Sequence, residues 1–61
     1  MEYRIRAKTL EGRILTYHHV KEYTAKEGLI SFIDNKTKKT RIYPASSVEI
    51  EPEYEGGSNE Y

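Results

Sequence analysis

Apolar and polar residues alternate along residues 2–9 (EYRIRAKT). Three apolar side chains fall on one side of this segment when it is extended: Tyr3, Ile5 and Ala7. Three basic side chains fall on the other side: Arg4, Arg6 and Lys8. A repeat of two residues is typical of a β-strand with one buried face, whereas an amphipathic helix repeats every three to four residues. The pattern therefore predicts a half-buried strand.

A three-residue loop, Leu10-Glu11-Gly12, separates this strand from a second one predicted over residues 13–20. Gly12 tolerates a left-handed backbone conformation that would strain Glu11. A type I turn closed by a Gly bulge therefore fits better than a two-residue primed turn. The polar pair His18-His19 predicts a bend near the end of the second strand.

The loop sets which residues of the two strands face each other, because a shift of one residue turns every side chain to the opposite face. With a three-residue loop, the inward pairs are Ala7 with Leu15, Ile5 with Tyr17, and Tyr3 with His19. The outward pairs are Arg6 with Thr16 and Arg4 with His18. A two-residue loop would instead turn Leu15, Tyr17 and His19 to solvent, and we favour the three-residue register.

The segment between the second and third strands predicts a turn. Ala25-Lys26-Glu27-Gly28 fits a four-residue turn closed by Gly28, around which Val20 and Tyr23 can pair with Leu29 and Ile30. A helix over residues 21–26 is the alternative, and helices that short are marginal.

Three further strands are predicted over residues 29–34, 40–43 and 48–51. Asp34 and Asn35 open a polar turn over residues 34–39, because their side chains bond their own backbone. Pro44 ends the fourth strand and leads into a 3₁₀ turn over residues 45–47, and Pro52 ends the fifth strand.

Charge is unevenly distributed along the 61 residues, although the formal net charge is zero. Residues 1–50 hold all ten Lys and Arg residues and six acids, which leaves a charge of +4. The residues from Glu51 onward hold four acids and no base, a charge of −4. We therefore expect one small β-barrel domain over residues 1–51, followed by a disordered acidic tail over residues 52–61.

The predicted order of five short strands, with a 3₁₀ turn before the last one, is the layout of SH3-like and Sm-like small barrels. The segment Ile42-Tyr43-Pro44-Ala45-Ser46-Ser47-Val48-Glu49 resembles the end of an SH3 domain, where Pro and a 3₁₀ turn lead into the last strand. The resemblance covers this C-terminal segment only and implies an all-β fold, a five-stranded SH3-like barrel. The chain has no Trp and no aromatic-rich stretch near its start, so the Pro-rich peptide binding of SH3 domains is not implied.

The sequence lacks the patterns that catalysis, cofactor binding or a metal site requires. It has no Cys, no His-Glu-x-x-His motif and no Gly-rich phosphate loop. His18 and His19 are adjacent, so on a regular strand they point to opposite faces and cannot chelate one metal ion. We therefore expect neither enzymatic activity nor a cofactor. No apolar run reaches the roughly 20 residues of a membrane-spanning helix, and there is no signal-peptide core, so we expect a cytoplasmic protein without membrane contact.

Basic residues give the strongest functional indication. With one tyrosine they form the candidate binding surface: Arg4, Arg6, Lys8, Lys36, Lys38, Lys39, Arg41 and Tyr43. Such residues suit weak, salt-dependent binding of nucleic acid through the turn and strand over residues 36–41 and the first strand. Lysines in this position also discourage pairing between strand edges. The acidic tail would compete with phosphates for the same residues.

A small domain with a thin core and open strand edges gains stability when it dimerises or binds a partner. Tyrosines are enriched in such interfaces. We therefore expect a non-enzymatic binding module that contacts a protein partner or forms a homo-oligomer, with nucleic-acid binding as the alternative. A free-standing chain of this size also fits a viral or mobile-element accessory protein, such as an inhibitor of a host enzyme.

Overall fold

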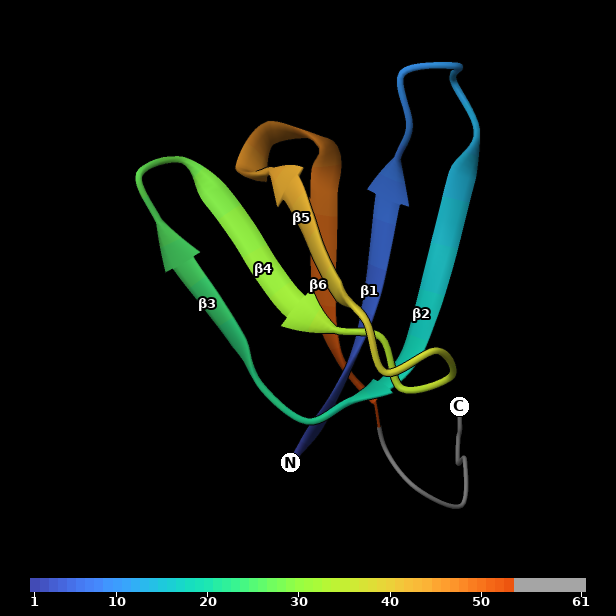
Figure 1. Ribbon diagram of the computed structural model, residues 1–61, viewed down its shortest axis with the longest axis vertical. Helices are drawn as coiled ribbons and strands as arrows, with labels where there is room; N and C mark the ends of the chain where they lie inside the picture. The colour runs from blue at the N-terminus through green and yellow to red at the C-terminus, as the bar shows by residue number, and fades with distance from the viewer. Residues whose placement is uncertain (54–61) are drawn as a thin grey trace.

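The computed structural model describes residues 1–53, which form β-strands, turns and one short 3₁₀ helix (Figure 1). The strands make two antiparallel sheets of three strands each. Sheet A has the order β2-β1-β6, with β2 over Ile14–Val20, β1 over Glu2–Lys8 and β6 over Val48–Glu53. Sheet B has the order β3-β4-β5, with β3 over Tyr23–Lys26, β4 over Leu29–Ile33 and β5 over Thr40–Pro44. The all-β prediction is confirmed. Of the predicted disordered tail, residues 54–61 lie outside the described residues.

Residues 1–53 contain six strands, one more than the five that the sequence predicts. The chain leaves sheet A after Val20 and enters sheet B at Tyr23, so that β3 is a separate strand. β3 pairs with β4 in a second hairpin, and the alternative helix over residues 21–26 does not form. The predicted pairing within this hairpin is wrong, because Tyr23 pairs with Phe32 and Val20 belongs to β2, where it pairs with Tyr3. In Figure 1 the strands of sheet B lie on one side of the molecule and those of sheet A on the other.

The first hairpin has the predicted three-residue loop. Thr9 donates its backbone N–H to the Arg13 carbonyl at 2.8 Å, and the Gly12 N–H donates to the Thr9 carbonyl at 2.9 Å. Gly12 has a φ of 86°, a conformation that favours glycine. Three predicted pairs are confirmed: Ala7 with Leu15, Ile5 with Tyr17, and Arg6 with Thr16. The predicted pair of Arg4 with His18 is absent from the ladder.

A β-bulge at His18-His19 changes the register near the end of β2. Tyr3 pairs with Val20 instead of the predicted His19, because His19 has a φ of 58° and one extra residue is accommodated there. Val20 is thereby turned into the core, where it is buried. The Glu53 carboxylate holds the bulge: it accepts the His19 N–H at 2.8 Å, and its other oxygen lies 2.7 Å from His18 Nδ1.

The last strand extends further than the sequence predicts. The predicted 3₁₀ turn forms over Ala45–Ser47, directly after β5. β6 then continues through Pro52 to Glu53, although Pro52 was expected to end it. Because β6 is an edge strand, a residue without an N–H donor is tolerated there. The boundary predicted after Glu51 therefore falls inside a strand.

The core lies between the two sheets. Six apolar residues are buried in it: Ile5, Ala7, Tyr17, Val20, Ile30 and Phe32. Tyr17 joins the sheets, because its ring meets that of Phe32 edge-on at 4.9 Å and its hydroxyl lies 2.5 Å from that of Tyr43. Burial, together with this hydrogen bond, raises the pKa of Tyr17 to about 12. The phenol therefore stays neutral at physiological pH.

The loop of the second hairpin is tighter than predicted. Lys26 pairs with Leu29, so the loop consists of Glu27 and Gly28 alone, and not of the four residues from Ala25 to Gly28. Both residues have left-handed backbones, with φ values of 54° and 77°. This is the two-residue geometry whose twist matches the flanking strands. Gly28 adopts it freely, whereas a residue with a Cβ atom is disfavoured by about 1–2 kcal/mol.

Replacing Glu27 with glycine should therefore stabilise the protein by about 1 kcal/mol, because the steric clash of the Cβ atom is removed. In thermal unfolding followed by circular dichroism, Tm should rise by roughly 4–8 °C. Glu11→Gly is the matched control, because Glu11 lies in the other hairpin loop and its φ is not positive. That substitution should leave Tm unchanged or lower it. An equal gain from both substitutions would contradict the assignment of strain to Glu27.

Candidate interaction surfaces

The outward face of sheet A carries charges that pair with one another. Arg4 and Arg6 of β1 lie opposite Glu51 and Glu49 of β6 in the antiparallel ladder. Arg4 donates to the Glu51 carboxylate, and the Arg6 guanidinium lies 3.3 Å from Glu49 and 3.4 Å from Glu51. The bond to Glu51 raises the pKa of Arg4, and the same bond lowers the pKa of Glu51. The two arginines of β1 are therefore neutralised by β6.

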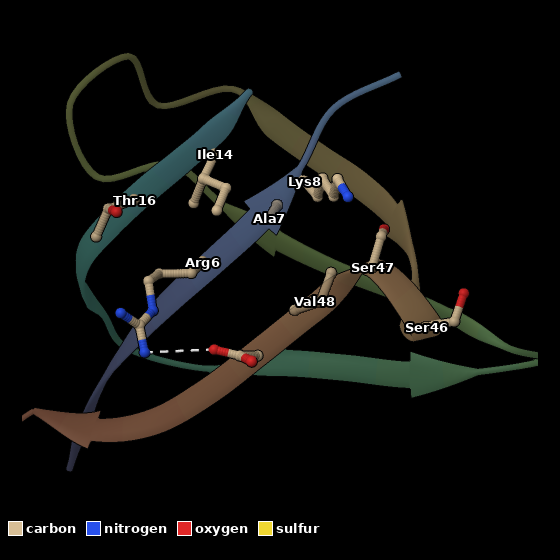
Figure 2. Close-up of a pocket in the computed structure, with 9 residues that line it drawn as sticks. Arg6, Ala7, Lys8, Ile14, Thr16, Ser46, Ser47 and Val48 are labelled. Atoms are coloured by element: carbon tan, nitrogen blue, oxygen red, sulfur yellow. Dashed lines mark ion pairs between the residues drawn. The ribbon is translucent and has the colours of Figure 1, made fainter. Parts of the chain in front are cut away.

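A shallow hollow of about 500 Å³ lies at one end of this face, beside the 3₁₀ turn (Figure 2). Its lining includes Arg6, Lys8, Ile14, Thr16, Ser46 and Ser47. Figure 2 shows the ion pair between Arg6 and Glu49 of β6, and the Lys8 side chain points away from this ion pair. Lys8 forms no ion pair within residues 1–53, so this hollow offers a ligand one unpaired basic group.

The eight residues of the predicted basic surface fall in three places. The outward face of sheet A holds Arg4, Arg6 and Lys8. The turn between β4 and β5 holds Lys36, Lys38 and Lys39. Inward positions of β5 hold Arg41 and Tyr43. Arg41 lies 3.8 Å from Asp34, and Tyr43 is half-buried against the core.

The turn between β4 and β5 is built around the buried carboxylate of Asp34. This group accepts hydrogen bonds from the Lys36 N–H and the Thr37 hydroxyl, both at 3.0 Å. The bond from the Lys36 amide is the main cause of the lowered pKa of Asp34, so the carboxylate stays charged and fixes the turn. The lysines themselves project from the turn. Within residues 1–53 no acid pairs with any of the three: Lys36, Lys38 and Lys39.

The outward face of sheet B differs from that of sheet A, because its central residues carry no charge. Seven residues form what we call the uncharged face: Thr24, Leu29, Ser31, Ile33, Thr40, Ile42 and Pro44. Lys26, which pairs with Leu29, lies at the edge of this face and is not counted in it. The register places these residues in adjacent rows on the three strands. Leu29, Ile33 and Ile42 are 47%, 59% and 60% exposed. Exposed apolar patches with polar surroundings mark interaction sites.

The sequence pattern does not single out this face. The burial of Ile30 and Phe32 is enough to account for the strand predicted over residues 29–34. The missed signal is the nearly unbroken apolar character of Leu29–Ile33 (LISFI). A strand with one solvent face alternates, whereas a continuous apolar run is typical of a strand that is covered on both faces.

Two hollows extend the uncharged face. One of about 380 Å³ is lined by Glu22, Tyr23, Thr24, Ser31, Phe32, Ile33 and Thr40, which places Glu22 at the rim of the face. The other, of about 740 Å³, lies at the edge strand β5 and includes Leu10, Ile42 and Pro44 in its lining. Apolar surface therefore continues from sheet B around β5 to the first hairpin loop.

Other kinds of site find no support in the part of the chain that the structure describes. There, no group of three or more His, Asp or Glu side chains is arranged to hold a metal ion. Over the same residues, no helix has the length and apolar character needed to cross a membrane. Comparisons of the chain with models of protein families, with curated proteins and with solved structures gave no match.

Three carboxylates should make the protein less stable in acid: Asp34, Glu51 and Glu53. Burial opposes ionisation of Glu53, but the bonds from His19 and His18 outweigh it, and its pKa is also lowered. A carboxylate whose pKa is lower in the folded protein stabilises the fold above its unfolded pKa of about 4, and this stabilisation is lost as pH falls through the folded pKa. We therefore expect the urea midpoint to fall steadily from about pH 5 downward.

The substitution Glu51→Gln separates the contribution of the linked carboxylates from any other loss of stability in acid. The variant should be less stable than the wild type at neutral pH and should lose less stability on acidification, because one of the linked carboxylates is gone. Glu11→Gln is the control, since Glu11 is exposed and lies outside these networks. A pH profile of Glu51→Gln as steep as that of the wild type would contradict the assignment.

Proposed function

We propose that this protein is a non-enzymatic binding module that contacts a protein surface through the uncharged face of sheet B. One observation carries the proposal: Leu29, Ile33 and Ile42 are half-exposed on one face, where the charged ladder residue, Lys26, lies at the edge. The sequence independently favours action through a protein partner or through self-association. A role as an accessory or inhibitor protein would use the same face.

The energetics of the two outward faces favour sheet B as the contact surface. Full burial of a Leu or Ile side chain is worth about 1.5–3 kcal/mol, and about half of this is still available at each of the three exposed positions. The sum of roughly 2–4 kcal/mol supports a weak complex, since a Kd of 1 mM corresponds to about 4 kcal/mol. Covering Arg4 or Arg6 on sheet A would instead desolvate charges that already have partners, which rarely adds net stability.

We also propose that the two sheets are the halves of a small SH3-like barrel. Support comes from the strand order, since β6-β1-β2 leads along the chain into β3-β4-β5. The 3₁₀ turn over Ala45–Ser47 directly before the last strand adds support, as does the hydroxyl pair of Tyr17 and Tyr43 that bridges β2 and β5. Such a fold hosts many functions, so the proposed function depends on the uncharged face and not on the fold.

Replacing Ile33 and Ile42 together with lysine should weaken binding at least tenfold, because two charges would have to be desolvated in the contact. The partner can be isolated by affinity capture from the source cells and identified by mass spectrometry. Binding is then measured by calorimetry with the purified partner. Because both side chains are exposed, the double variant should keep the wild-type circular dichroism spectrum.

The matched control is Ile14→Lys. Ile14 is 64% exposed, close to the values of Ile33 and Ile42, but it lies on β2 in sheet A. This variant should bind like the wild type. Loss of binding in Ile14→Lys together with full binding by the double variant would refute the proposed function.

A second candidate function is weak binding of nucleic acid at the turn between β4 and β5. The observation that favours it is the contrast between two sets of basic residues. Within residues 1–53 the turn lysines have no acidic partner, whereas Arg4 and Arg6 are paired with β6. In this proposal phosphate contacts come from the turn alone. Binding through three lysines would be weak and would depend only moderately on salt.

Reversing the charge of Lys36, Lys38 and Lys39 to Glu should abolish binding of a short single-stranded DNA measured by fluorescence anisotropy. The wild type should show a slope of about −2 in a plot of log K against log salt, as expected for three contacts with single-stranded phosphates. Lys8→Glu is the control, because it changes a charge of the same sign on sheet A. No binding by the wild type at low salt would remove this candidate.

A further inference from the structure

We propose that the occupant of the uncharged face is a second copy of this chain. The two copies are related by a two-fold axis that lies in the interface and runs perpendicular to the strands of sheet B. This inference rests on the proposed function, because it names the partner of the same face. It is carried by the positions of two charged residues at the rim of that face, Glu22 and Lys26.

Lys26 is the last residue of β3 and Glu22 directly precedes its first residue, so the two charged residues flank Thr24 at opposite ends of this strand. Lys26 pairs with Leu29 in the ladder, and alternation along the strand places Thr24 on the same face. Glu22 lines the same hollow as Thr24 and Ile33, at the other end of the strand. Both charged residues are exposed, and neither forms an ion pair within residues 1–53. The strand therefore presents one positive end and one negative end.

A two-fold axis perpendicular to the strands, passing over the middle of β4, reverses the strand direction in the second copy. Leu29 of one copy then lies over Ile33 of the other, and Ile42 lies over its own counterpart. The same operation brings Lys26 opposite Glu22 of the other copy, and symmetry repeats this contact. Apolar residues therefore meet apolar residues and opposite charges meet, which is the self-complementarity that a two-fold interface requires.

An axis parallel to the strands does not produce this match. It would lay β3 of one copy over β5 of the other. Lys26 would then face Pro44, which shares the Leu29 row, and Glu22 would face Thr40, which shares the Ile33 row. Both charges would lose water without gaining a partner, which is unfavourable. The perpendicular axis is therefore the one that the charges select.

The size of sheet B predicts a weak dimer. Three strands about 4.8 Å apart and five residues long, at about 3.3 Å per residue, cover roughly 14 Å by 17 Å. This is well below the ~800 Å² per partner of a standard interface, even with contributions from the rim. Two such sheets would pack face to face about 10 Å apart, within reach of the Lys and Glu side chains across the axis.

Sedimentation equilibrium from about 10 μM to about 1 mM protein covers the range in which a dimer of this size should form. The wild type should dimerise. Glu22→Lys and Lys26→Glu should each weaken the dimer about tenfold, because each substitution creates two like-charge contacts across the axis. An equimolar mixture of the two variants should recover the wild-type affinity as a heterodimer, in which both contacts again join opposite charges. Such recovery cannot arise from pairing within one chain.

A wild type that stays monomeric over the whole range, or a mixture that associates no better than the single variants, would overturn the proposed dimer. The double substitution Ile33→Lys and Ile42→Lys separates this failure from failure of the proposed function. If the wild type is monomeric but the double variant still loses a protein partner, the binding face stands and the dimer fails. If the wild type dimerises and the double variant dimerises equally well, the dimer contact lies elsewhere and the proposed dimer fails, while the proposed function is decided by the binding of the protein partner.

Discussion

The burial of Ile30 and Phe32 between the two sheets fixes the arrangement of everything else in sheet B. Alternate residues of a strand point to opposite faces, so placing these two side chains in the core forces Leu29 and Ile33 outward. The register of β5 follows the same rule, and Ile42 is left on the outward face. The contact that closes the core therefore also creates the apolar surface outside it. A slip of one residue in β4 would turn Ile30 and Phe32 to solvent, so that both the core and the apolar surface outside it would be lost.

Charge pairing organises the opposite side of the molecule. The antiparallel pairing of β1 with β6 sets Arg4 and Arg6 beside the acids of β6, far away in the sequence. Glu53, at the end of the same strand, holds the bulge that turns Val20 into the core. The charges of sheet A thus serve the fold, and this leaves the two outward faces with different characters. On sheet A the two arginines are paired within the chain, whereas sheet B presents three half-exposed apolar side chains that would gain from a partner.

Local patterns in the sequence predict the local structure, as Gly12 does for the first loop and its register. Two of the local errors, at His19 and Glu27, place a non-glycine residue in a left-handed conformation that its own preferences disfavour. At His19 the hydrogen bond to Glu53 compensates, and no local pattern contains that contact. The same limit applies to function. The arginines of β1 form a free basic stripe in the sequence because their acidic partners are distant, and the uncharged face is assembled from three strands that only folding brings together.

The most direct test of the proposed dimer is a set of methyl NMR spectra of isoleucine-labelled protein recorded over a range of protein concentrations. The chain offers its own control, because Ile33 and Ile42 lie on the uncharged face and the equally exposed Ile14 lies on sheet A. We predict that the methyl signals of Ile33 and Ile42 shift as concentration rises, while that of Ile14 stays in place. Shifts confined to Ile14, or constant positions for all three signals up to the highest concentration, would contradict the claim that the uncharged face binds a second copy of the chain.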